Sequence, residues 1–294
     1  MRKKQAAIIA IFGGVVILLI KLLAFFVSNS IALLSDALES IVNIGASGLM
    51  LFSVWVSEKP PDDSHNYGHQ KIEGISSFLE GLFIIIAALL IVYTASGRLF
   101  SPFLPKELNW AIGISAVATS LNGVLSVFLA RTAKKSGSLA LEGDSKHLLS
   151  DVISSAGVWV GLFIVELTGW SFIDPVLAFA ISGLVGYMGF RLVYKSCQSL
   201  MDNACKAEEA KIREVLNRHK FRFIDFHDMK TRRNGSLVFA ELHLSVDGSL
   251  SVNEAHDLTD HLEDELKGEL PNASLTIHVE PKKPVASPKD KKLV

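Results

Sequence analysis

The stretch from Leu141 to Asp151 contains the residues best suited to metal binding. It carries three carboxylates and one histidine, and an apolar run continues from it to about Leu167. His147 and Asp151 are one helical turn apart, so a helix projects both side chains from one face. A charge at the centre of a membrane helix costs about 2.5–3.5 kcal/mol and normally faces a bundle interior. We expect the pair to supply half of a divalent-metal site. The alternative is a hydrogen-bonded pair that only joins two helices.

A second polar stripe interrupts the apolar segment Ile31–Val56. Asp36, Glu39 and Asn43 fall within about 60° of one another around a helix. Small residues follow Asn43 and allow a neighbouring helix to approach closely. We expect this stripe to supply the other half of the metal site. A stripe used for helix packing alone is the alternative.

The loop Glu58–Lys71 is a further candidate for metal binding. Its prolines and glycine rule out a continuous helix. Asp62, His65 and His69 could converge there on one ion, and two histidines with an aspartate are a ligand set that zinc uses. A solvated loop with an incidental pair of histidines is equally common.

The elements that position these residues are membrane helices. The chain has 294 residues, is 49% hydrophobic and has a mean hydropathy of +0.36, values typical of a small helical membrane protein. Segments long enough to cross about 30 Å of hydrocarbon lie at Ala6–Val27, Ile31–Val56, Ile75–Ser96, Leu108–Ala130, Leu141–Leu167 and Ile173–Val193.

Lysine and arginine predict the orientation of these six segments. Most of the flanking basic residues lie on the side of both termini, which should therefore be cytoplasmic. We expect a multi-pass protein of the cell (inner) membrane, embedded in the lipid bilayer. The net charge of −1 gives no reason to expect a nucleic-acid partner.

After about Val193 the composition becomes polar and predicts a soluble α+β domain in the order αββαβ. Alternating polar and apolar residues indicate strands with one buried face, and Asn234–Gly235 is typical of a hairpin turn. The expected elements are a helix at 207–218, strands at 221–231 and 236–246, a helix at 252–267 and a strand at 273–280.

The soluble domain carries six of the nine histidines. His278 and Glu280 share one face of the last strand, which indicates metal binding there. His227 on the first strand and His256 on the second helix are further candidates. We place the membrane domain at 1–198, the soluble domain at 199–282 and a disordered tail at 283–294.

Four sequence blocks together resemble the cation diffusion facilitator family of divalent-metal/proton antiporters, of the bacterial zinc/iron efflux type. They are the stripe ending in Asn43, the loop Asp62–Lys71, the His147–Asp151 pair and the histidine-bearing αββαβ domain. The resemblance implies a six-helix membrane domain and a metallochaperone-like cytoplasmic domain, assembled as a homodimer.

The resemblance also implies three metal sites and one contact between subunits. The transport site would be Glu39, Asn43, His147 and Asp151. The loop would bind metal through Asp62, His65 and His69, and the dimer interface through His227, His243, His256, His278 and Glu280. A salt bridge between subunits would join Lys71 and Asp202.

One position departs from the family pattern. Zinc-transporting members generally place Asp or His and then Asp on the second span, whereas this chain has Glu39 and Asn43. An asparagine carbonyl oxygen suits harder ions better than zinc. Asp36, on the same stripe, could restore the missing charge.

We expect a secondary transporter that exports zinc, iron or manganese from the cytoplasm in exchange for protons. The divalent ion would be both substrate and regulator, the latter through the cytoplasmic domain. A membrane metal sensor or scaffold that moves no ion is the alternative. We do not expect an enzyme, because the chain has no His-Glu-x-x-His or comparable motif.

Overall fold

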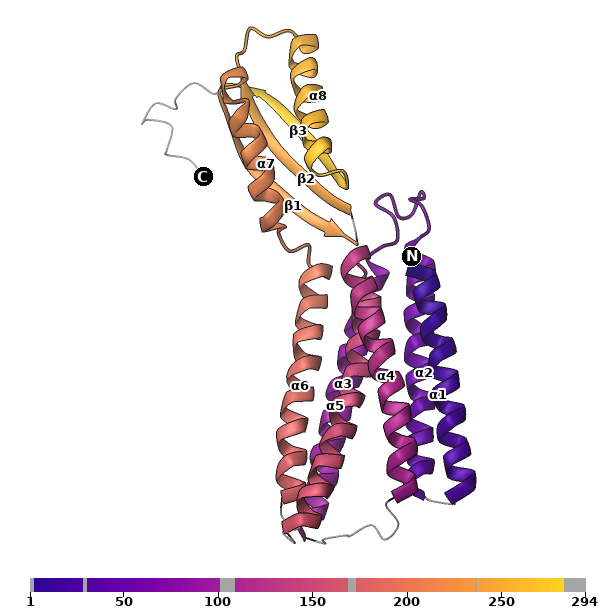
Figure 1. The fold of residues 1–294 in the computed structure, drawn as a ribbon. Helices are drawn as coiled ribbons and strands as arrows, with labels where there is room; N and C mark the ends of the chain where they lie inside the picture. The colour runs from indigo at the N-terminus through magenta and orange to yellow at the C-terminus, as the bar shows by residue number, and fades with distance from the viewer. Residues whose placement is uncertain (1–2, 29–30, 101–108, 169–172, 236, 283–294) are drawn as a thin grey trace. The chain divides into compact units, whose positions relative to one another are not determined.

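The computed structural model describes residues 3–28, 31–100, 109–168, 173–235 and 237–282 (Figure 1). Some side chains inside the helices, including those of Asp36 and Glu39, lie outside the description. The chain forms two compact units, Met1–Leu200 and Met201–Val294, and each is described by itself. The expected tail at 283–294 lies outside the described residues.

Six helices and the loop between the second and third of them make up most of the described part of the first unit, and all six expected spans are confirmed as helices (Figure 1). They are α1 (Lys3–Ser28), α2 (Ile31–Ser57), α3 (Ile72–Phe100), α4 (Asn109–Ser136), α5 (Leu139–Thr168) and α6 (Ile173–Leu200). Four described segments are long and apolar enough to cross a membrane: Lys3–Leu23, Ile72–Gly97, Ala116–Ser136 and Val176–Leu200.

The junction of α4 and α5 follows from two residues. Gly137 has a φ of +65°, a left-handed conformation that glycine adopts without strain and that ends α4. The Ser138 hydroxyl then accepts a hydrogen bond from the Leu141 backbone N–H at 3.3 Å and caps α5. This tight junction places the polar start of α5 inside the bundle.

Helices α3 and α6 pack at close range because glycines face each other. A Cβ atom at Gly189 would lie 2.9 Å from the Gly81 carbonyl oxygen, and one at Gly81 would lie 3.0 Å from the Val193 nitrogen. Small residues of this kind let membrane helices bring their backbones together. Glu80 is therefore carried on a helix that is fixed against α6.

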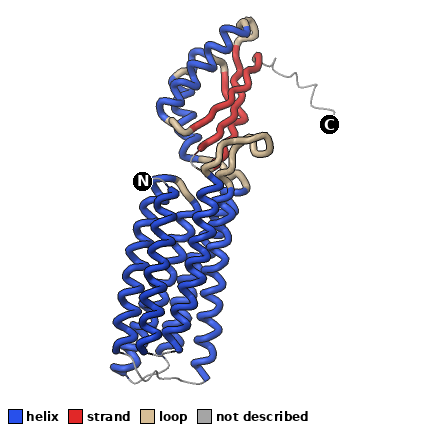
Figure 2. The backbone as a smooth tube through the Cα atoms, turned by 90° about the vertical axis from the view of Figure 1, so that its right-hand side faces the viewer, coloured by secondary structure: helices blue, strands red, loops and turns tan. Residues whose placement is uncertain are grey.

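The second unit is an α+β domain with a three-stranded sheet, as expected (Figure 2). Its strand order is β1-β2-β3. Strand β2 runs antiparallel to β1 and parallel to β3. The elements are α7 (Lys206–Arg218), a short 3-10 helix (Lys220–Arg222), β1 (Asp225–Asn234), β2 (Leu237–Val246), α8 (Val252–Glu269) and β3 (Ala273–Pro281).

Both helices of this unit cover the apolar face of the sheet. Ile212 and Leu216 of α7 and Leu262 of α8 form one buried core with Leu242 and Leu244 of β2. Ser251 and Glu254 form a reciprocal capping box at the start of α8. The polar residues of the alternating pattern lie on the opposite face of the sheet.

The prediction that the first strand begins at Phe221 is wrong. The chain forms a 3-10 turn over Lys220–Arg222, and the strand begins at Asp225. The physical reason is that Phe223 turns into the core between helix and sheet, where it is 7% exposed. A bulge also interrupts β1, with Asp228 at a φ of +49°.

Candidate metal centres

Asn43, His147 and Asp151 lie together between α2 and α5, and we name them the membrane site. The Asn43 amide nitrogen donates a hydrogen bond of 2.7 Å to the Asp151 carboxylate. The His147 Nε2 lies 2.9 Å from the Asn43 carbonyl oxygen. Asn43 and His147 are buried, at 8% and 5% exposure. The structure thus brings three of the four predicted transport residues together.

The contact to Asp151 fixes the proton on His147. A carboxylate only accepts hydrogen bonds, so the NH₂ end of the Asn43 amide must face Asp151. The carbonyl end then faces His147 and also only accepts, so Nε2 of the imidazole carries the hydrogen in this arrangement. A metal ion bound through Nε2 has to displace this hydrogen bond, and the hydrogen then moves to Nδ1 or leaves the ring.

The predicted stripe has two further members on α2. Glu39 and Asp36 belong to α2, one and two turns before Asn43, but their side chains lie outside the described residues. The predictions that Glu39 binds the ion and that Asp36 restores a charge remain predictions.

A second polar layer lies one turn further along α2. The Ser47 hydroxyl donates to both carboxylate oxygens of Asp144, at 2.9 and 3.2 Å. Glu80 of α3 is fully buried, and within the described part of the bundle neither of its carboxylate oxygens has a hydrogen-bond partner. The negative charges of Asp144 and Asp151 both act on it. Glu80 therefore belongs to an acidic layer next to the membrane site.

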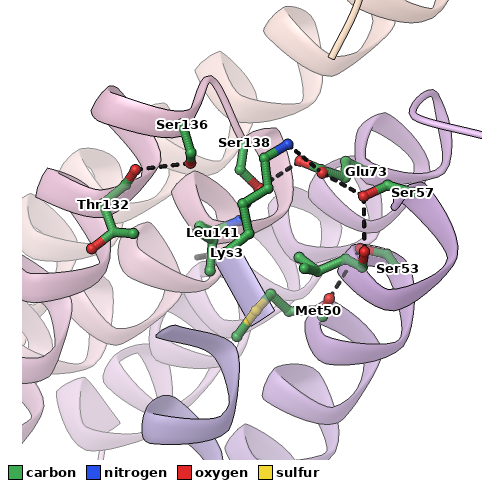
Figure 3. A network of polar contacts seen from close by, with 10 residues as sticks. Lys3, Met50, Ser53, Ser57, Glu73, Thr132, Ser136, Ser138 and Leu141 are labelled. Carbon is green, nitrogen blue, oxygen red and sulfur yellow. Dashed lines mark hydrogen bonds and ion pairs between the residues drawn. The ribbon is translucent and has the colours of Figure 1, made fainter. Parts of the chain in front are cut away.

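A third layer is built around Glu73, and Figure 3 shows how its members converge. The carboxylate accepts hydrogen bonds from Lys3 at 2.9 Å, from Ser57 at 2.7 Å and from Ser138. We call these four residues the Glu73 network. The network joins α1, α2 and α3 to the start of α5. The Glu73 carboxylate has one cation and two hydroxyl donors as partners, unlike that of Glu80.

Asp62, His65 and His69 of the loop between α2 and α3 converge as predicted, and we name them the loop site. The Asp62 carboxylate lies 3.3 Å from a ring nitrogen of each histidine, and the two rings are 4.3 Å apart. Hydrogen bonds from the Ser64 hydroxyl and the His65 backbone lower the pKa of Asp62 to about 2. The carboxylate is therefore charged at physiological pH.

Three histidines form a row across the outer face of the sheet. His227 of β1 pairs in register with His243 of β2, which pairs with His278 of β3. The ring centroids are 5.4 and 4.8 Å apart along this row. Residues in register on neighbouring strands point to the same face, so the backbone alone brings the imidazoles together.

Glu280 completes this cluster, which we name the sheet site: His227, His243, His278 and Glu280. Its carboxylate lies 3.2 Å from His227 and 3.6 Å from His243. Asp228 at the bulge lies 3.8 Å from His243, and no sequence signal marked it. A hydrogen bond and the charge of Lys230 lower the pKa of Asp228, so it adds a negative charge beside the row.

His256, also predicted as a ligand here, is not part of the sheet site within the chain. It lies on α8, which covers the apolar face of the sheet, and it pairs with Asp260 at 3.5 Å. The prediction that His256 binds metal at a dimer interface remains a prediction.

Comparison with protein families identifies the two units. Residues 7–201 match the model of the cation efflux transmembrane domain, and residues 205–282 match that of the cation efflux protein cytoplasmic domain. The chain belongs to the cation efflux family. This family consists of transporters, and its members are integral membrane proteins that export metal cations.

Several relatives of the cation efflux family match over nearly their full length. An uncharacterized transporter of Synechocystis sp. is 35% identical over 276 residues, 94% of this chain and 89% of the relative. The cation-efflux pump FieF of Shewanella oneidensis is 30% identical over 278 residues, covering 95% and 94%. The metal-bound C-terminal domain of the CzcD transporter from Thermotoga maritima is 33% identical, covering 27% of this chain and 93% of that domain, with a TM-score of 0.26.

Proposed function

We propose that this chain exports divalent transition-metal ions from the cytoplasm across the cell (inner) membrane, in exchange for protons that move inward. The observation that carries the proposal is the cluster of buried Asn43 and His147 with the partly buried Asp151 inside the helical unit of a cation efflux family member. An imidazole, a carboxylate and an amide oxygen are competent ligands for such ions.

Proton exchange follows from the chemistry of these ligands. An ion binds only to a His147 nitrogen that carries no hydrogen and to a charged Asp151 carboxylate, so an imidazolium or a protonated carboxyl at this site has to release its proton when the ion binds. Protonation of the same groups from the other side of the membrane competes the ion off. One set of residues thus binds either a metal ion or protons, which is the requirement for antiport.

Zinc, iron and manganese are the candidate ions. The sheet site and the loop site contain imidazoles, which suit zinc and iron, whereas the amide oxygen of Asn43 suits harder ions. We propose that metal binding at the sheet site and at the loop site regulates transport by favouring one state of a homodimer. The salt bridge between Lys71 and Asp202 of two subunits belongs to this proposal; within the chain, Asp202 lies 4.0 Å from Arg232.

Metal flux in proteoliposomes tests the proposed function. Purified protein is reconstituted, a pH gradient is imposed, and uptake of zinc, iron and manganese is compared with vesicles that lack the gradient. Antiport predicts uptake that depends on the gradient and is accompanied by proton release. A protein that binds metal but produces no flux for any of the three ions would instead be a sensor or scaffold.

A further inference from the structure

We propose that His219, His261 and Glu265 form an additional metal site, separate from the three predicted sites, and we name it the helix site. Candidate ligand atoms of the three residues all lie within 4.8 Å of one another. His219 follows the last residue of α7, while His261 and Glu265 are one turn apart on α8. The three side chains therefore meet where the end of one helix reaches the side of the other.

The hydrogen bonding of His219 prepares one of its nitrogens for a metal. Its Nδ1 lies 3.1 Å from the Val215 carbonyl oxygen, which can only accept, so Nδ1 carries the hydrogen. The other nitrogen, Nε2, then has the lone pair in the neutral ring. A backbone carbonyl that fixes the tautomer in this way is typical of histidines that bind metal.

His261 supplies an independent observation that indicates a ligand. Its Nε2 is buried and has no hydrogen-bond partner among the described residues. A buried polar atom without a partner costs free energy, and a metal ion would satisfy it. The rings of His219 and His261 lie edge to face with centroids 5.0 Å apart, so both can contribute a nitrogen to one ion.

The charges around the cluster are compatible with a cation. Arg218 is the neighbouring positive charge, and its guanidinium pairs with Glu269. Glu214 and Glu265 also act electrostatically on Arg218, so its positive charge is offset by several carboxylates. Two imidazoles and one carboxylate are the ligand set of zinc sites that keep a fourth position open for water.

The helix site shares no residue with the sheet site. Helix α8 covers the apolar face of the sheet, whereas the histidine row lies on the opposite face. An ion at the helix site would join the end of α7 to α8 and stabilise the domain independently of the sheet. The domain would then bind zinc-type ions at two places that can be separated by mutation.

Zinc binding to the full-length protein tests this site. The background is the His65→Ala, His243→Ala double variant in detergent, which weakens the loop site and the sheet site. Equilibrium dialysis with zinc counts the bound ions, and cobalt absorption reports tetrahedral coordination. We expect His261→Gln to remove about one ion per chain and the corresponding cobalt absorption.

Two further variants make the result decisive. Glu265→Gln should weaken zinc binding, whereas the matched control Glu263→Gln, on the same helix and paired with Lys267, should not. His219→Gln should reproduce His261→Gln, and circular dichroism verifies that each variant is folded. An unchanged zinc count in both folded histidine variants, or an equal loss in Glu263→Gln, would overturn the proposal.

Discussion

In the membrane site the candidate ligands are hydrogen-bonded to one another, whereas in the sheet site they stand side by side on an accessible face. Asn43 contacts both His147 and Asp151 inside the helical unit. His227, His243 and His278 are held in a row by strand register and need no mutual hydrogen bond. Before metal binds, the same kinds of side chain are thus hydrogen-bonded to one another in the membrane site and held in place by the backbone in the sheet site.

This difference predicts different costs of metal binding. An ion entering the membrane site has to break the contacts of Asn43 and competes with protons for His147 and Asp151, so binding there requires rearrangement and depends on pH. An ion entering the sheet site meets ligands already in position and partly solvated. The first arrangement suits transport, where an ion must also leave, and the second suits sensing.

The largest expected effect is the loss of transport on removing Asp151. We expect Asp151→Ala to abolish flux in proteoliposomes while the protein still folds, because a charge inside a membrane helix is a cost to folding and not a support. The matched variant Asp151→Asn keeps the size of the side chain and an oxygen that can accept the hydrogen bond from Asn43, but it removes the negative charge. It should be equally inactive, and wild-type flux in either variant would remove Asp151 from the membrane site.

The next prediction compares two buried acids of α3. Glu73→Gln should destabilise the protein by about 1–3 kcal/mol, because Lys3 and two serines lose a charged partner. Glu80→Gln should be neutral or stabilising, because it replaces a buried acid whose oxygens have no hydrogen-bond partner among the described residues. Thermal unfolding in detergent measures both. Equal loss of stability in the two variants would show that Glu80 is compensated after all.

A smaller change is expected when the membrane site gains a third acid. In the wild type the Asn43 amide nitrogen donates a hydrogen bond of 2.7 Å to the Asp151 carboxylate. Asn43→Asp replaces this donor with a second carboxylate. Like-charge repulsion should keep an additional proton in the site when the metal is absent. We expect the preference among transported metal ions to shift toward zinc, and more protons to be released per ion bound. Metal flux and proton release in proteoliposomes across pH 6–8 measure both quantities. Unchanged values for both would mean that Asn43 does not face the ion.

The smallest effect on transport is expected from the sheet site. His243→Ala with His278→Ala should lose at least about one bound zinc per chain and the corresponding increase in thermal stability. Transport at saturating metal should persist, since the membrane site is intact. Loss of flux equal to that of Asp151→Ala would remove the distinction between a transport site and a regulatory site.

The sequence predicted the helices, the sheet and most ligands because each depends on local patterns. Apolar length marked the six helices, and alternation marked the strands that bring His243 and His278 into register. The i, i+4 spacing predicted that His147 and Asp151 share one helix face, and the family resemblance placed them with Asn43, where the structure has them.

The contacts that sequence reasoning missed depend on chain geometry or on distant residues. Asp228 enters the sheet site only because a bulge turns the backbone to a φ of +49°. Glu80 joins Asp144 because Gly143 lets α3 approach α5, where a Cβ atom would lie 3.1 Å from the Glu80 side chain. The cluster of His219 and His261 depends on how α7 ends against α8, which no periodicity encodes.

The Glu73 network also gives the chain an order of assembly during synthesis. Lys3 and Ser57 leave the ribosome before Glu73, so the carboxylate can enter the bilayer with a cation and a hydroxyl already available. Ser138 follows 65 residues later and joins the start of α5 to this preformed cluster. Glu73 can thus be inserted with its charge already neutralised, and the second half of the bundle then docks onto this cluster.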